Sequence, residues 1–287
     1  MKHSVRISAA VLAVAALATA ADQRLAEAHK LYNATDFQQS LKVLQSIQPK
    51  DGAVYELMGR DYYMEADYRH ATESLEKAVA LEPANAVFAL WLGRAWGRRA
   101  ETSGPFTAPV YASKARQFLE KSVQLNPADI DAQGDLFEYY LEAPGFLGGG
   151  LDKAQDLAER ISRISPADGQ GAEAKLAEKR KESRTAEAHL RRAVELAPQQ
   201  AGKIIELARF LSKQGRYQEA EQNFQRAEQV APNSPRLVFE RASIYIESHH
   251  NLELAQELLK RYMNMNLDPE DPPKSQAAKL LRQAQGG

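Results

Sequence analysis

Prolines that recur at a fixed interval constrain this chain more than any other feature of its sequence. The interval from Pro49 to Pro83 equals the interval from Pro198 to Pro232. A fixed period of about 34 residues is typical of solenoid proteins, in which each repeat is a small unit that cannot bury its apolar side chains alone. Neighbouring repeats must therefore stack to form one continuous core.

The residues before two of these prolines follow a common pattern. Small residues stand where two antiparallel helices must approach closely, and larger apolar residues such as Leu75 and Leu119 are expected to pack on the neighbouring hairpin. The pattern reads Tyr55, Met58, Gly59, Tyr62, Tyr68, Ala71, Leu75 and Ala78 before Pro83, and Ile204, Leu207, Ala208, Leu211, Tyr217, Ala220, Phe224 and Ala227 before Pro232. It resembles the tetratricopeptide repeat (TPR) family over nearly all of the chain after Ala20. The resemblance implies an all-α fold, a right-handed superhelical solenoid of about seven helical hairpins with a C-terminal capping helix.

The prolines also set the boundaries of the predicted hairpins. These boundaries are 23–48, 52–82, 86–126, 130–165, 169–197, 201–231 and 235–266. The residue two places after a proline is expected to cap the next helix, and these residues are Asn85, Asp129, Asp168 and Ser234. The predicted domains are a signal peptide at 1–20, a TPR solenoid at 21–270, and a capping helix with a tail at 271–287.

The N-terminal segment, 1–20, has the composition of a secretory signal peptide. The cationic start MKHSVR precedes the apolar run ISAAVLAVAALA and then small residues, so cleavage is expected after Ala20 or Ala21. The apolar run is too short to cross a bilayer, and no second such run follows, so no integral membrane segment is expected in the mature chain. An uncleaved amphipathic anchor is the alternative. We expect an exported protein, either periplasmic or secreted.

The charge balance bears on the class of partner. The chain has 37 basic and 38 acidic residues, which gives a formal net charge of −1. A nucleic-acid-binding protein normally presents a basic face, and the most basic stretch here, residues 175–192, is interrupted by glutamates. A protein or peptide partner is therefore expected, with no nucleic acid, and the oligomeric state is left open.

The segment EAPGFLGGGLDKA, residues 142–154, raises the question of catalysis because its glycines suggest a phosphate-binding loop. Gly145 and Gly150 have the required spacing, but Leu151 and Asp152 replace the lysine and the hydroxyl residue, which favours a turn between two helices. Cysteine is absent, and no two histidines have the spacing of metal ligands on a helix. We therefore predict no catalytic residue, no metal and no cofactor, and a protein that is not an enzyme.

The TPR resemblance implies that the first helix of each hairpin lines a concave groove. Carried over position by position, the candidate partner-binding residues are Arg60, Tyr63, Met64, Arg94, Arg98, Arg209 and Phe239. Arginines at a repeated groove position suit carboxylates or an acidic peptide. The alternative is that they pair with neighbouring glutamates and only solubilise the groove face.

Two hairpins are longer than the repeat and offer a second candidate surface. Their surplus residues fall within 98–113 and 142–154, which makes these inserted loops a possible binding edge. The sequence thus predicts a non-catalytic exported scaffold that holds a peptide or protein in the groove or along the inserted-loop edge. The alternatives are a structural subunit of a cell-envelope assembly and, less favoured, an enzyme on a TPR scaffold.

Overall fold

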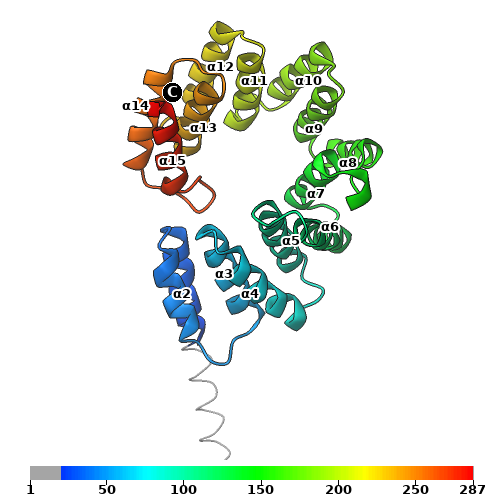
Figure 1. The fold of residues 1–287 in the computed structure, drawn as a ribbon, viewed down its shortest axis with the longest axis vertical. Coiled ribbons are helices and arrows are strands. Elements are labelled where there is room, and N and C mark those ends of the chain that lie inside the picture. Colours follow the sequence, from blue (N-terminus) through cyan, green and yellow to red (C-terminus); the bar gives the residue numbers. More distant parts are fainter. Residues whose placement is uncertain (1–20, 287) are drawn as a thin grey trace, which may run out of the picture. The chain divides into compact units, whose positions relative to one another are not determined.

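A computed structural model describes residues 21–286 of the protein, and every regular element among them is a helix (Figure 1). The predicted signal peptide lies outside the described residues. The chain divides into two compact units, which we call unit 1, ending at Asn126, and unit 2, beginning at Pro127.

Unit 1 contains three helical hairpins. Residues 21–33 form a helix that pairs with α2, and the labelled helices are α2 (Phe37–Gln45), α3 (Gly52–Met64), α4 (Tyr68–Leu81), α5 (Ala86–Glu101) and α6 (Ala108–Leu125).

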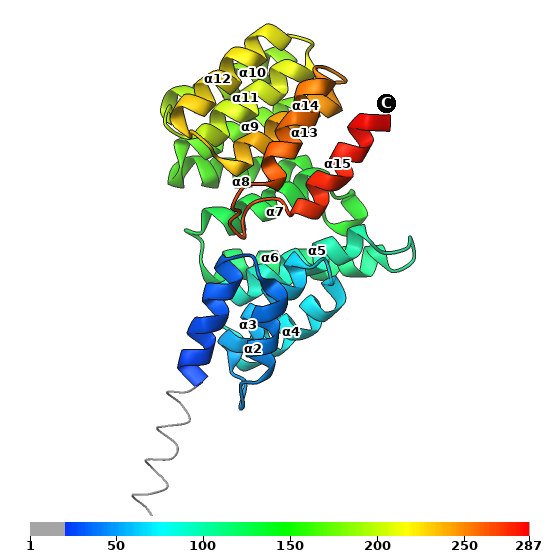
Figure 2. The same ribbon diagram turned by 90° about the vertical axis from the view of Figure 1, so that its left-hand side faces the viewer.

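Unit 2 contains four more hairpins and a final helix. Its elements are α7 (Ile130–Glu142), the short 3₁₀-helix η1 (Gly145–Leu147), α8 (Leu151–Ile164), α9 (Pro166–Lys179), α10 (Ser183–Leu196), α11 (Ala201–Lys213), α12 (Tyr217–Val230), α13 (Pro235–Glu247), α14 (Leu252–Met263) and α15 (Lys274–Gly286). The predicted hairpins are confirmed, with a shifted start for the fifth. Figure 2 shows α15 beside α13 and α14, where it buries Ala277 as a capping helix should.

Three of the four predicted capping residues start a helix, because their polar side chains satisfy the first free backbone N–H groups. Asn85 accepts hydrogen bonds from the backbone of Val87 and Phe88, Asp129 caps α7 and Ser234 caps α13. The prediction that Asp168 caps the fifth hairpin is wrong. Helix α9 starts directly at Pro166, and Ser165 ends α8 and begins α9.

Within a hairpin, a leucine of the second helix packs onto a glycine of the first. A Cβ atom on Gly59 would lie 2.4 Å from Cγ of Leu75, and one on Gly93 would lie 2.9 Å from side-chain carbons of Leu119. These leucines therefore fill their own hairpin, whereas the sequence suggested packing on the next one. The spacing explains why glycine occupies the crossing point of these helices.

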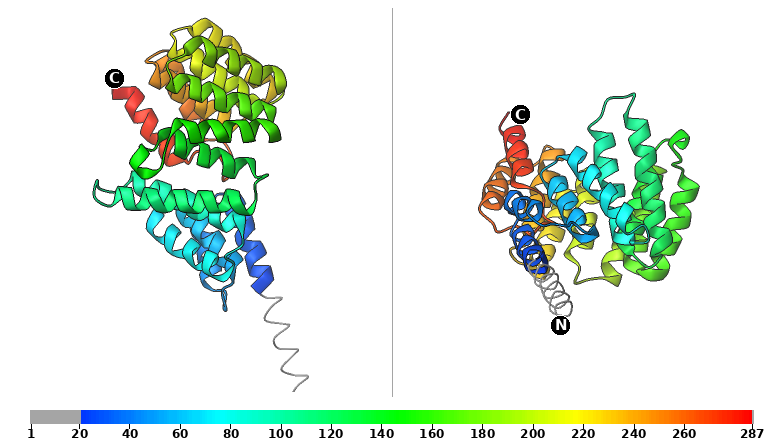
Figure 3. Two further views of the ribbon diagram at one scale, coloured as in Figure 1. Left: turned by 90° about the vertical axis from the view of Figure 1, so that its right-hand side faces the viewer. Right: turned by 90° about the horizontal axis from the view of Figure 1, so that it is seen from below.

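The longest hairpin absorbs its surplus residues mainly as helix. Helix α5 has 16 residues and α6 has 18, whereas α3 and α4 have 13 and 14, so only residues 102–107 lie outside the helices. Figure 3 shows this hairpin projecting beyond α3 and α4. The expectation of a loop over 98–113 is therefore wrong for most of that segment.

Candidate functional site

The first helices of unit 1 carry a cluster of arginines and aromatic rings, which we call the aromatic–arginine face. It consists of Arg60 and Tyr63 on α3, Tyr68 at the start of α4, and Trp91, Arg94 and Arg98 on α5. Cζ of Arg60 lies 4.7 Å from the centre of the Trp91 ring, and Cζ of Arg94 lies 5.0 Å from it. Tyr63 packs edge-on against both Trp91 and Tyr68, with ring centres 5.6 Å apart in each case.

Arg60 is the most firmly held of these residues. Its Nε and Nη2 atoms donate to Oη of Tyr32 at 3.3 and 3.2 Å, and its Nη1 atom lies 3.5 Å from Oε1 of Glu56. Burial raises the pKa of the Glu56 carboxyl, although Arg60 partly offsets this effect. Through Tyr32 and Trp91, Arg60 joins the first helices of three successive hairpins. Its side chain is only 22% exposed, so it contributes little open surface.

Arg94 and Arg98 lie further along α5, about one helical turn apart. Arg98 donates from Nε to Oη of Tyr68 at 3.3 Å and forms an ion pair with Glu101, while its Cζ atom lies 5.5 Å from the centre of the Tyr68 ring. Arg98 is exposed and Arg94 is half-buried. A guanidinium that stacks on a ring keeps its N–H edge directed outward, which is the geometry that binds a carboxylate.

Met64 belongs to the same helix as Arg60 but has a different environment. It is half-buried and packs against the core cluster of the first two hairpins, which includes Tyr32 and Leu57. The structure therefore groups Arg60, Tyr63, Arg94 and Arg98 as predicted and places Met64 against the core. Sequence reasoning missed Trp91, although it stands three residues before Arg94 on the same helix, a spacing that brings side chains together.

The predicted groove residues of unit 2 are less available. Phe239 is only 4% exposed because Tyr262 of α14 and its neighbours cover it, with ring centres 5.2 Å apart, so the prediction that it lines an open groove is wrong. Arg209 forms ion pairs with Glu240 and Glu247, the latter at 3.2 Å. For Arg209, pairing with neighbouring glutamates is the arrangement in the structure.

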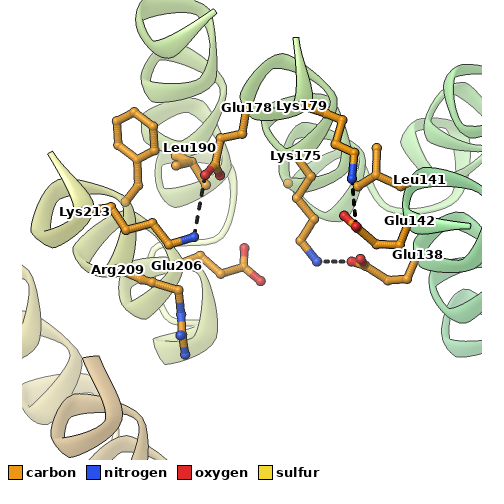
Figure 4. Close-up of a pocket in the computed structure, with 12 residues that line it drawn as sticks. Glu138, Leu141, Glu142, Lys175, Glu178, Lys179, Leu190, Glu206, Arg209 and Lys213 are labelled. Atoms are coloured by element: carbon orange, nitrogen blue, oxygen red, sulfur yellow. Dashed lines mark hydrogen bonds and ion pairs between the residues drawn. The ribbon is translucent and has the colours of Figure 1, made fainter. Parts of the chain in front are cut away.

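Unit 2 nevertheless contains a pocket of about 340 Å³ on its first helices (Figure 4). It is lined by residues from α7, α9 and α11 together with Leu190 of α10: Glu138, Leu141, Glu142, Gly171, Lys175, Glu178, Lys179, Leu190, Glu206, Arg209, Phe210 and Lys213. Its charged side chains pair from one first helix to the next. Figure 4 shows Lys175 with Glu138, Lys179 with Glu142 at 2.7 Å, and Lys213 with Glu178 at 3.8 Å.

Lys175, Glu178 and Lys179 were not among the residues predicted from the sequence. The reason is that α9 starts early, at Pro166. The groove positions of this hairpin therefore lie two residues earlier in the sequence than expected. Counted from Ala167, Lys175 and Lys179 occupy the ninth and thirteenth positions, as Arg94 and Arg98 do when counted from Ala86.

The glycine-rich segment folds as a turn that closes onto α8. Tyr139 Oη donates to the carbonyl oxygen of Leu147 at 2.9 Å, and Nζ of Lys153 donates to that of Gly148 at 2.9 Å. A Cβ atom on Gly149 would lie 1.9 Å from the carbonyl oxygen of Ala143, so this close approach requires glycine. The segment is therefore the helix-connecting turn that the sequence indicated.

Among residues 21–286, no group of three or more histidine, aspartate or glutamate side chains is placed to hold a metal ion. His250 stacks on Tyr217, with ring centres 3.9 Å apart. None of the described helices is both long enough and apolar enough to cross a membrane.

The known proteins and families that this chain resembles contain tetratricopeptide repeats. Residues 211–284 match the family model described as tetratricopeptide repeat, and no curated protein matches the chain. Among solved structures, a tetratricopeptide repeat protein from Parabacteroides merdae is similar, with 13% identity, a TM-score of 0.60, and coverage of 93% of this chain and 99% of that chain.

Two further solved structures share the fold. A thermophilic TPR protein from Thermus thermophilus has 18% identity and a TM-score of 0.52, with coverage of 70% of this chain and 99% of that chain. The human IFIT1 dimer with PPP-AAAA has 16% identity and a TM-score of 0.51, with coverage of 73% of this chain and 55% of that chain. At these identities, the likeness concerns the architecture alone.

Proposed function

Because the chain is a tetratricopeptide repeat protein, we propose that it is an exported, non-catalytic scaffold that holds an acidic segment of a peptide or protein partner on the aromatic–arginine face of unit 1. The fold supports protein interaction in general. The observation that carries the finer proposal is the shared Trp91 ring, on which two guanidinium groups from different helices are stacked.

An aromatic ring holds the plane of a stacked guanidinium group in place, so little side-chain entropy remains to be lost when a carboxylate binds to its N–H edge. Arg94 and Arg98 are one helical turn apart and therefore suit two carboxylates of one extended segment. The surface ion pair between Arg98 and Glu101 contributes little stability, so an incoming carboxylate can replace Glu101.

The pocket of unit 2 suits an acidic ligand less well. Its lysines pair with glutamates of the neighbouring first helix, as Lys179 does with Glu142, so an incoming carboxylate would have to break contacts that join two helices. This pocket provides a matched control, because Lys175 and Lys179 occupy the same repeat positions as Arg94 and Arg98.

The test is selection from a random peptide library displayed to the immobilised mature chain, residues 21–287, at physiological salt. We expect the bound peptides to be enriched in aspartate and glutamate. The double variant Arg94→Ala, Arg98→Ala should lose about tenfold or more in affinity for a selected peptide, the loss typical of removing charged hydrogen bonds. The double variant Lys175→Ala, Lys179→Ala should keep its affinity within about threefold, since these lysines lie on α9, outside the proposed peptide site.

Two results contradict the proposal. One is selection without acidic enrichment, and the other is an equal loss in both double variants, which would locate binding elsewhere or attribute it to net charge. Because IFIT1, a protein of the same fold, was solved with PPP-AAAA, a single-stranded RNA oligonucleotide is included as a competitor. Displacement of the selected peptide by RNA at equal concentration would favour a nucleic-acid partner.

A further inference from the structure

The extended hairpin of unit 1 ends in an apolar tip. Residues 102–113 contain no charged side chain, in a chain of which 26% is charged. At this tip the Phe106 side chain is 94% exposed and Val110 is 56% exposed. Pro105 and Pro109 flank Phe106 and restrict the backbone that presents it.

The base of this tip is rigid. Trp96 of α5 packs on Tyr111 of α6, with ring centres 5.0 Å apart. Cζ of Arg99 lies 4.9 Å from the centre of the Trp96 ring and 4.6 Å from that of Tyr111, and Nζ of Lys114 lies 3.9 Å from the centre of the Trp96 ring. These contacts hold the two lengthened helices together, so the tip is presented in one orientation.

The sequence on both sides of the tip carries an excess of basic residues. Between Arg94 and Arg116 the sequence contains five cationic side chains and a single acid, Glu101, although the whole chain has a net charge of −1. Lys114, the first residue after the tip, is 42% exposed and its Nζ atom lies 3.6 Å from Oε1 of Glu76 on α4. An exposed apolar tip with cations behind it matches the chemistry of an anionic membrane surface, with apolar side chains at the acyl boundary and cations at the phosphates.

We propose that this tip docks on the surface of an anionic phospholipid bilayer, with Phe106 and Val110 entering the interface and Lys114 facing the lipid phosphates. Such peripheral contact needs no membrane-spanning helix. The proposal goes beyond the scaffold function and does not depend on it, because the apolar side chains at the tip are separate from Trp91 and the arginines stacked on it.

The second insertion offers an internal comparison. Phe146 at its tip is 81% exposed, but the charges near it are different. Glu142 and Asp152 flank this turn, Lys179 pairs with Glu142, and Lys153 is directed to the carbonyl oxygen of Gly148. Phe146 therefore has the exposed ring without the basic surroundings, and a substitution there is a matched control.

The first experiment measures co-sedimentation of the mature chain with vesicles of phosphatidylglycerol and phosphatidylcholine in equal amounts, and with pure phosphatidylcholine. We expect binding to the anionic vesicles that weakens at high salt. The double variant Phe106→Ser, Val110→Ser should lose at least about tenfold in affinity for these vesicles, since two apolar side chains no longer enter the interface. Phe146→Ser should bind as the wild type does, and circular dichroism will check that each variant is folded.

The second experiment locates the contact. The chain contains no cysteine, so Thr107→Cys accepts a single environment-sensitive fluorophore at the tip. The emission of this label should shift to the blue on anionic vesicles, whereas a label at Ala84→Cys, before the opposite end of α5, should not change. Absence of vesicle binding, unaltered binding by the Phe106 and Val110 double variant, or a shift only at position 84 overturns the proposal. Loss of peptide binding in the Arg94 and Arg98 variant has no bearing on it.

Discussion

The substitution Asp61→Asn should stabilise unit 1 at neutral and alkaline pH. Asp61 lies on α3 and is 0% exposed, and neither carboxylate oxygen has a hydrogen-bond partner in the structure. The nearby hydroxyl of Ser40 donates to the carbonyl oxygen of Ala28 at 3.1 Å. Burial raises the pKa of Asp61 from its ordinary 3.8 to about 7, with Ser40 and Arg60 offsetting only part of the effect.

The direction and size of the effect follow from this pKa. Below the unfolded value of 3.8 the carboxyl is protonated in both states, so its ionisation does not affect stability. As pH rises toward 7 the unfolded chain releases the proton while the folded chain retains it, so stability falls across this interval and levels off above it. A difference of about three pH units corresponds to about 4 kcal/mol. Asp61→Asn removes this loss, so we expect a gain of about 2 to 4 kcal/mol at pH 8 and little change near pH 4.

The assay is urea unfolding of the mature chain followed by tryptophan fluorescence at several pH values. Both tryptophans, Trp91 and Trp96, lie in unit 1, so the signal reports on the unit that contains Asp61. Asp156→Asn, an exposed aspartate on α8, is the control and should change stability by less than about 0.5 kcal/mol. If wild-type unit 1 does not lose stability between pH 4 and pH 7, or if Asp61→Asn is no more stable at pH 8, the buried neutral carboxyl is disproved.

Two further predictions concern packing and export. Gly59→Ala should destabilise unit 1 by about 1 to 3 kcal/mol in the same fluorescence assay, because the added methyl group would overlap Leu75. A Cβ atom added at Gly97 would lie 4.0 Å from its nearest neighbour, so Gly97→Ala should be neutral or stabilising. An equal loss of stability in both variants would refute this account of the helix crossing. The full-length chain expressed in bacteria should be recovered outside the cytoplasm with its N-terminus at Ala21 or Asp22. Recovery of the intact chain in the cytoplasm would contradict export.

The sequence alone was sufficient to predict the repeats. The regular spacing of the prolines, small residues at helix crossings and caps such as Asn85 and Asp129 are local features, because each depends on residues within one hairpin or at its ends. The hairpin boundaries follow from them. The failure at Asp168 has a local cause as well, since helix α9 takes Pro166 as its first residue and leaves no connecting loop.

The candidate site was predicted only in part, because it depends on contacts between hairpins. The repeat positions identified Arg60, Tyr63, Arg94 and Arg98, but not Trp91, the ring on which two of these arginines stack.

The periodic pattern specifies the order of the helices and the side of each hairpin that faces its neighbours. The packing of the helices against one another decides which of those side chains remain available. Tyr262 packs on Phe239, and Glu240 and Glu247 pair with Arg209, so two predicted groove residues are already occupied within unit 2. Burial and charge pairing depend on the neighbouring helices, which a periodic pattern does not specify.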